Sequence, residues 1–195
     1  MSEGQKIYDF VEEIFPICRS IMGEGNRETL SRIQKHIPIQ IKEVPTGYQA
    51  YDWEVPKEWV INEAYVVDPK GNRILDFKVN NLHVVNYSIP VNREMSLEEL
   101  QNHLYSIPDK PDAIPYITSY YDEKWGFCLT HEQREKLVPG KYKVYIDSEH
   151  KDGSLSYGEL ILPGETTEEI FLTSYICHPS MANNECSGPA VLTFI

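Results

Sequence analysis

The sequence predicts an α/β framework that is interrupted by a β-rich module. Apolar residues recur at helical spacing near the N-terminus, and short strand-like segments separated by turns fill the middle of the chain. A continuous apolar run, followed by a helix start, then closes the sequence. Strands that alternate with helices at both ends of a strand-rich segment are typical of one domain placed within another.

The N-terminal segment predicts two helices and one strand. Apolar residues between positions 7 and 21 follow a helical period, which Pro16 should kink or divide at a join. "GEGN" separates a second helix, which we expect Asn26 to cap. The alternating "IQIKEV" at 39–44 is typical of a strand. Residues 1–54 are therefore assigned to the N-terminal helices and first strand of the framework.

Turn and capping signals organise the middle of the chain. "AYVVDPKGNRILDF" predicts a hairpin around "DPKGN", and "NLHVVNYSIPV" predicts a further strand. Ser96 with Glu99, and Thr130 with Gln133, have the spacing of capping boxes that begin short helices. Residues 55–140 are assigned to an inserted β-rich domain of α+β type.

The C-terminal segment, 141–195, predicts a return to the framework. "KYKVYIDSEH" and "SLSYGELILPG" flank "KDG" as in a hairpin, and "EIFLTSYIC" is apolar enough for a strand in the sheet centre. Ser187 then opens a helix. A central strand with so little after it is an unfinished βαβ unit, so we expect the framework to be truncated here.

Composition limits the classes of partner. The chain has 30 acidic and 18 basic side chains, a formal charge of −12, which argues against nucleic acid and anionic membranes. No run of about 18 apolar residues predicts a membrane span, and the acidic N-terminus lacks the features of a secretory signal. We expect a cytoplasmic protein with four free cysteines.

His178 is the strongest candidate for chemistry. It lies just past the end of the predicted central strand, where ligands bind in open α/β sheets. Ser180, Asn184 and Glu185 follow it with oxygen donors, and Ser187 would present backbone N–H groups at a helix start. The pattern indicates a metal or catalytic corner; the alternative is a structural histidine.

The sequence gives less support for nucleophilic catalysis and for other candidate sites. Neighbours on a strand point to opposite faces, so we expect Cys177 and His178 not to form a thiolate–imidazole pair, and Ser187 lacks the GxSxG elbow. His83 can be read as substrate-facing or as packed, and packing is favoured. A set of aromatic side chains can likewise be read as lining a pocket or as packing at a domain junction, and packing is again favoured: Tyr48, Tyr51, Trp53 and Trp59.

The order strand, His, small loop, Asn-Glu-x-Ser-Gly, helix resembles the first metal-binding segment of the two-zinc aminopeptidases, a superfamily that includes bacterial leucyl aminopeptidases and glutamate carboxypeptidases. More closely, the chain resembles a family of bacterial aminopeptidase-like proteins often encoded near polysaccharide-biosynthesis genes. Segments spanning almost the whole chain carry this resemblance, among them "CRSIMGEGNRETL", "PTGYQAYDWEVPKEWVI", "IPYITSYYDEKWGFCL" and "ICHPSMANNECSG". It implies a zinc-peptidase-like α/β core with a β-rich domain inserted after the first strand.

The resemblance also implies site residues. His178 matches the first zinc ligand, and Ser180 stands where an aspartate orients that histidine. Asn184 occupies the position of the aspartate that bridges two metals, and the neighbouring Glu185 can substitute for it. Because an amide oxygen is neutral, the metal set His178, Asn184 and Glu185 is open to one, two or no zinc ions.

These expectations define two candidate functions. The first is the N-terminal part of a zinc-dependent aminopeptidase-like hydrolase that acts on an amide or peptide bond of a small substrate. The superfamily's catalytic glutamate and further ligands lie downstream, so we expect the 195-residue fragment to be inactive. The second, favoured by Asn184 and Ser180, is a non-catalytic pseudo-enzyme or small-ligand-binding module. Exposed strand edges in the β-rich module allow a homo-oligomer.

Overall fold

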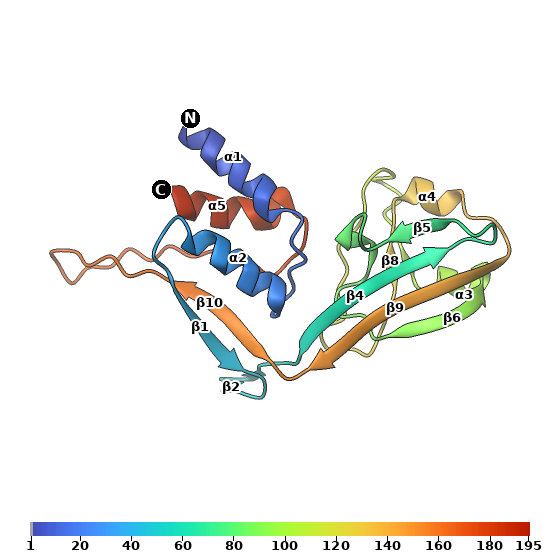
Figure 1. Cartoon of the computed structure of the whole chain (residues 1–195), viewed down its shortest axis with the longest axis horizontal. Helices are drawn as coiled ribbons and strands as arrows, with labels where there is room; N and C mark the ends of the chain where they lie inside the picture. Colours follow the sequence, from blue (N-terminus) through green and yellow to red (C-terminus); the bar gives the residue numbers. More distant parts are fainter. Residues whose placement is uncertain (1) are drawn as a thin grey trace. The chain divides into compact units, whose positions relative to one another are not determined.

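The computed structural model describes residues 2–195, which divide into two compact units (Figure 1). Unit 1 joins the two ends of the chain, up to Glu58 and from Lys151 onward, and unit 2 is Trp59–His150. From the sequence, these boundaries are predicted after residues 54 and 140. The second one was wrong because strand β9 (Lys141–Lys151) belongs to the sheet of unit 2. That the units are a peptidase core and an insertion remains a prediction.

Unit 1 places helices beside a two-stranded antiparallel sheet, in which β1 pairs with β10 (Figure 1). Helix α1 packs against α5, and α2 packs against β10. Its elements are α1 (Glu3–Ile14), α2 (Glu24–Gln34), β1 (Gln40–Pro45), β2 (Gln49–Ala50), β3 (Trp53–Glu54), β10 (Ser154–Glu159), the π-helical turn η2 (Ala182–Cys186) and α5 (Ser187–Phe194).

The N-terminal helices show where local signals hold and where they fail. Ser2 caps α1, which ends two residues before Pro16, as its fixed φ and missing N–H require. Gly23 rather than Asn26 precedes α2, so the predicted cap was wrong. The buried Asn26 side chain instead donates to the carbonyl of Ile176 at 3.0 Å. This amide therefore ties α2 to the segment that leads to His178.

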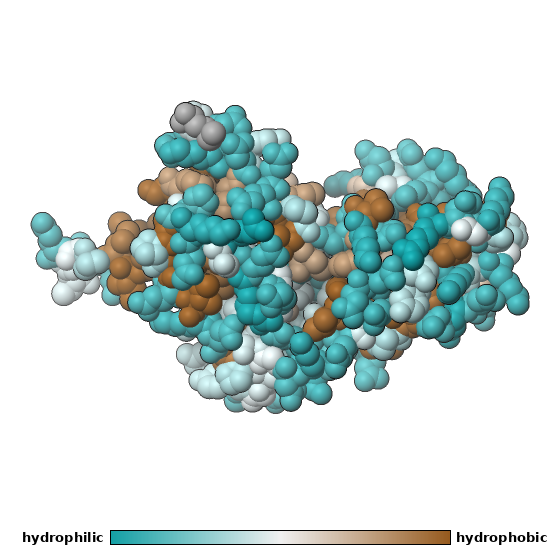
Figure 2. Space-filling model, viewed as in Figure 1, coloured by the Kyte–Doolittle hydropathy of each residue, from teal (hydrophilic) through white to brown (hydrophobic). Residues whose placement is uncertain are grey.

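The segment 170–177 is not a strand, which corrects the prediction of a central strand. Ile170 is 91% exposed and Phe171 85% exposed. A strand requires a neighbouring strand that pairs with its backbone. Within residues 2–195, the pairing of β1 with β10 ends at Gln40 and Glu159, and no strand pairs with the segment 170–177. Figure 2 shows the resulting exposed apolar surface on the extended segment 160–177, which follows β10.

The turn "KDG" does not close a hairpin. Strand β9 pairs with β4 and β6, whereas β10 pairs with β1. The chain passes from one unit to the other at this turn, and Glu58 anchors it by accepting the N–H of Ser154 at 2.9 Å. The pattern correctly marked a tight turn between two strands, but pairing is decided by which sheet each strand joins.

Unit 2 contains, among the described residues, a four-stranded sheet in the order β5-β4-β9-β6. The predicted hairpin is present as β4–β5, and both predicted capping boxes form, at Ser96–Glu99 and Thr130–Gln133. The strand predicted from Asn81 begins only at Val91. Its elements are β4 (Glu58–Val67), β5 (Arg73–Asp76), η1 (Asn81–His83), β6 (Val91–Ser96), α3 (Leu97–Gln101), β7 (Leu104–Tyr105), β8 (Phe127–Cys128), α4 (His131–Glu135) and β9.

Across residues 2–195, every helix is too short or too polar to span a bilayer.

Candidate metal centre

His178 and Glu185 meet at the loop between the extended segment and α5. Glu185 Oε1 accepts the backbone N–H of His178 at 2.8 Å. Its second oxygen, Oε2, lies 3.1 Å from the ring Nδ1 of the same histidine. Glu185 is only 1% exposed, so its carboxyl group is held in a nearly dry site.

A π-helical turn aims Glu185 inward. The N–H groups of Glu185 and Cys186 both donate to the carbonyl of Met181, at 2.9 and 3.0 Å. Such a turn inserts an extra residue into the helical path and often occurs at functional sites. Here it buries Glu185 while Asn184, one position earlier, remains exposed.

Cys177 joins this pair. Its Sγ lies 3.0 Å from His178 Nδ1, and the ligand atoms of Cys177, His178 and Glu185 all lie within 4.8 Å of one another. The expectation that neighbouring Cys177 and His178 point apart was wrong. That rule holds within a pleated strand, and this segment is not one.

Arg19 supports the cluster from behind and was missed by the sequence analysis. It is 1% exposed, and its Nε donates to the carbonyl of His178 at 3.1 Å. Its other nitrogens contact the carbonyl of Ile14 at 2.6 Å and Cys186 Sγ at 3.1 Å. The available signal was an arginine inside the otherwise apolar "IFPICRSIM", since a buried guanidinium needs several acceptors.

Burial controls the charge of the cluster. It raises the pKa of Glu185 to about 7, although the N–H of His178 and the charge of Arg19 oppose this shift. Burial, and then Glu185, raise the pKa of Cys177 to about 11, and burial and Arg19 lower that of His178. At neutral pH the thiol and imidazole are therefore uncharged, and the carboxyl group is close to half-protonated.

The geometry does not fit a nucleophilic triad. In such a triad the nucleophile and the acid contact opposite nitrogens of the imidazole, which relays a proton between them. Here Cys177 Sγ and Glu185 Oε2 both approach Nδ1 of His178. Sulfur, nitrogen and carboxylate donors around one point are instead the ligand types of a zinc site.

The remaining predicted residues lie differently. Ser180, whose φ is +41°, donates its hydroxyl to the carbonyl of Phe15 at 3.1 Å, so this bond does not orient His178. Asn184 lies in η2 with an exposed side chain, and its role as a ligand remains a prediction. The structure thus brings together His178 and Glu185 from the predicted set, and adds Cys177.

Two further candidates do not form a site. His83 is buried in unit 2 with Nδ1 2.8 Å from the carbonyl of Cys128, which agrees with a packed histidine. Tyr51, at the tip of the β2–β3 hairpin, is 99% exposed with a φ of +56°.

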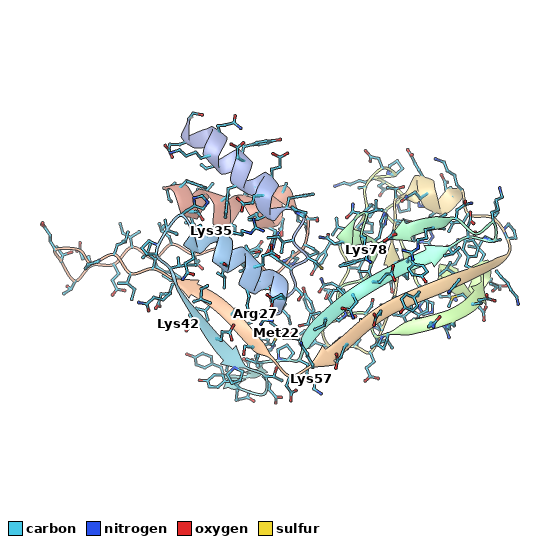
Figure 3. The ribbon with its side chains drawn as sticks, in the orientation of Figure 1. Met22, Arg27, Lys35, Lys42, Lys57 and Lys78 are labelled. Atoms are coloured by element: carbon cyan, nitrogen blue, oxygen red, sulfur yellow. The ribbon has the colours of Figure 1, made fainter. Side chains whose placement is uncertain are left out.

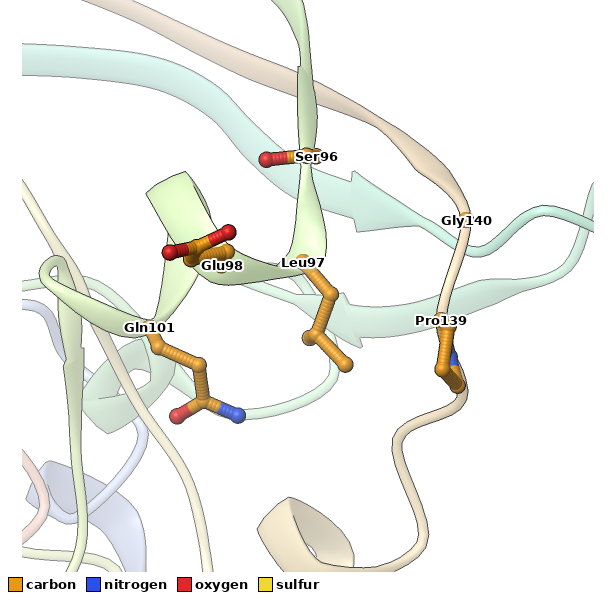
Figure 4. Close-up of a pocket in the computed structure, with 6 residues that line it drawn as sticks. All are labelled: Ser96, Leu97, Glu98, Gln101, Pro139 and Gly140. Atoms are coloured by element: carbon orange, nitrogen blue, oxygen red, sulfur yellow. The ribbon is translucent and has the colours of Figure 1, made fainter.

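A shallow hollow in unit 2 has a volume of about 410 Å³ (Figure 4). Its lining comes from the start of α3 and from the turn before β9: Ser96, Leu97, Glu98, Gln101, Pro139 and Gly140. Glu99 occupies the Ser96 hydroxyl and N–H groups in the capping box. Among the residues that line the hollow, Glu98 is therefore the one titratable side chain, and no base or free nucleophile lies with it.

Comparison with known proteins supports the resemblance in part. The chain is 54% identical over 192 residues to a Clostridium acetobutylicum protein named "Putative polysaccharide biosynthesis protein with aminopeptidase-like domain", covering 98% of this chain and 44% of that protein. A crystal structure described as a "putative peptidase" from the same organism matches with a TM-score of 0.95 and 54% identity, covering 98% of this chain and 45% of that one.

The chain therefore spans less than half the length of the relatives that it matches. A family model described as "Domain of unknown function (DUF4910)" matches residues 8–195. The chain belongs to the DUF4910 family.

Proposed function

We propose that this chain is the N-terminal part of a zinc-dependent, aminopeptidase-like hydrolase that acts on an amide or peptide bond. A peptidase-like role is supported by the names of the two relatives at 54% identity. Zinc dependence is the further step, and it rests on the Cys177–His178–Glu185 cluster.

The cluster fits a metal ion because one of its buried oxygens is left without a donor. Within residues 2–195, Glu185 Oε2 accepts no hydrogen bond, although it is buried. A buried carboxylate oxygen without a partner costs free energy, which a cation would recover. His178 would hold the zinc with Glu185, and Asn184 remains available from the exposed side of the same turn.

The chain's own residues fix the histidine in place. Glu185 binds the N–H of His178 and Arg19 binds its carbonyl, so both sides of this residue's backbone are held. When bound, zinc supplies Lewis acidity for the attack of water on an amide carbonyl. The catalytic glutamate would come from the part of the longer relatives that this chain does not cover, so the chain alone is proposed to be inactive.

A pseudo-enzyme or small-ligand-binding module is the second candidate. It is favoured by the exposed amide of Asn184 in place of a bridging carboxylate, and by Ser180, which bonds to Phe15. Such a module would keep the corner but not turn over a substrate.

Hydrolysis assays on the longer C. acetobutylicum relative, with this chain assayed beside it, test the proposal. Release of amine from aminoacyl anilides and from amide-linked amino sugars is measured before and after chelation, and again after zinc is restored. We expect activity in the relative that chelation abolishes and zinc restores, with none in the chain alone. Activity that is insensitive to chelation would overturn zinc dependence, and a relative without turnover on any such amide would favour the binding module.

A further inference from the structure

Cys177 lies where a third metal ligand could join His178 and Glu185. Its Sγ and the Oε2 of Glu185 approach the same ring nitrogen of His178, at 3.0 and 3.1 Å. Three donors of different chemistry therefore point at one small volume beside the start of η2.

We propose that the thiolate of Cys177 completes a three-ligand, single-metal site with His178 Nδ1 and Glu185 Oε2, for a borderline-soft divalent cation such as Zn²⁺ or Co²⁺. This inference rests on the proposed metal dependence and deepens it by naming the ligand set and the number of metals.

The distances are close to those of a tetrahedral site. Zinc–sulfur and zinc–nitrogen bonds of about 2.3 and 2.0–2.1 Å place neighbouring ligand atoms about 3.3–3.6 Å apart. The two separations from His178 Nδ1, at 3.0 and 3.1 Å, are a few tenths of an ångström shorter, and all three ligand atoms lie within 4.8 Å of one another. Cys177 and His178 are both partly exposed, so small movements of their side chains would admit a cation.

Glu185 gives a second and independent indication of a ligand. Its Oε1 is used by the N–H of His178, but Oε2 is buried and accepts no hydrogen bond from the described residues 2–195. The carboxylate is thus fixed through one oxygen and presents the other to the cluster. Pre-organised donors of this kind lower the cost of binding a metal.

The charges balance for one divalent ion. Binding breaks the S–H bond of Cys177, releases its proton to solvent and forms a sulfur–metal bond, with no change of oxidation state. Any proton on Glu185 is released to solvent in the same way, so that the thiolate and the Glu185 carboxylate neutralise the two positive charges while the imidazole stays neutral. The sulfur supplies the negative charge that the amide of Asn184 does not.

Cobalt spectroscopy tests this ligand set in the 195-residue chain. Co²⁺ is titrated into the wild type, Cys177→Ser and Cys18→Ser, and the sulfur-to-cobalt charge-transfer band and the visible d–d bands are recorded. Cys18→Ser is the matched control, because Cys18 is also a free cysteine of unit 1 with intermediate burial but contributes no donor to the cluster. Circular dichroism verifies that each variant is folded.

We expect the charge-transfer band in the wild type and in Cys18→Ser. In Cys177→Ser the band should be lost and cobalt affinity should fall at least about tenfold, because removing a direct ligand should cost no less than removing its outer-shell support. Cobalt bound with d–d bands but without the sulfur band, or a band that survives in Cys177→Ser, would overturn Cys177 as a ligand while leaving the proposed metal dependence intact. No cobalt binding to the wild type would overturn both.

Discussion

Glu185 contacts His178 at two points: its Oε1 accepts the backbone N–H at 2.8 Å, and its Oε2 lies 3.1 Å from ring Nδ1. One buried side chain thereby holds the backbone of the candidate ligand and places its second oxygen beside the ring. The two oxygens of Glu185 therefore have different roles. Oε1 stabilises the local backbone, and Oε2 is the proposed metal ligand.

Substitution of Glu185 should reveal the two contributions separately. Glu185→Ala removes the acceptor of the His178 N–H, a loss of about 1–3 kcal/mol, so amide exchange at His178 should accelerate about tenfold to hundredfold. Glu185→Gln keeps an acceptor of the same shape and should leave exchange nearly unchanged while zinc binding is lost. Native-state hydrogen exchange on both variants checks this, and equal acceleration in the two would contradict the assigned role of Oε1.

Arg19 should act on the metal through His178. Arg19→Met retains much of the packing volume but removes the donor to the His178 carbonyl, so zinc affinity should fall about tenfold. Arg19→Lys keeps the charge without the planar fork and should recover only part of that loss. Competitive zinc titrations measure the effect, and an affinity unchanged in Arg19→Met would refute the positioning role.

The ion pair of Arg27 with Glu58 should make unit 1 sensitive to acid. Arg27 (Figure 3) contacts Glu58 Oε1 at 2.6 Å, and Glu58 also accepts the N–H of Ser154. Burial raises the pKa of Glu58, but the bonds from Arg27 and Ser154, with the charges of Arg27 and Lys151, outweigh it and lower the pKa below the ordinary 4.5. Because the folded pKa is depressed, this stabilisation is complete above about pH 4.5 and is lost as the pH falls through the folded value.

Urea unfolding of unit 1 between pH 7 and pH 3 checks this prediction. Glu58→Gln should cost about 1–3 kcal/mol at pH 7 and should flatten the acid dependence. Glu24→Gln is the control, since Glu24 also pairs with Arg27 but is 83% exposed and should contribute little. If the two variants behave alike, the buried pair is not the source of the acid sensitivity.

Two helical glycines should respond in opposite directions. A Cβ on Gly25, in α2, would collide with the carbonyl oxygen of Cys18, whereas a Cβ on Gly4, in α1, would meet nothing within 4 Å. Gly4→Ala should therefore stabilise unit 1 by up to about 1 kcal/mol, as alanine does in exposed helices, and Gly25→Ala should destabilise it. Thermal melts of the two variants decide this, and stabilisation by both would show that the contact at Gly25 relaxes without cost.

Most local signals in the sequence predicted local structure correctly, with the cap expected at Asn26 as an exception. Pro16 limits α1, and the pairs Ser96–Glu99 and Thr130–Gln133 form their capping boxes, because each depends on residues within one turn of chain. The strand expected at 170–177 failed for the opposite reason, since a strand depends on a partner that its own residues do not encode.

The candidate site was predictable to a similar extent. His178 and Glu185 share one short loop after a predicted strand, and the resemblance to the two-zinc aminopeptidases brought them forward together as candidate ligands. The contact of Arg19 with the His178 carbonyl links positions 159 residues apart, and no periodicity reports such a bond. Cys177 was misjudged because the strand rule was applied to a segment that is extended but unpaired.

Elemental analysis of the purified chain, with His178→Ala beside it, is the most direct test of the central claim that His178 holds a metal. The account predicts about one zinc ion per wild-type chain and none in the variant, with circular dichroism unchanged between the two. Zinc absent from both proteins, or bound equally by both, would contradict it.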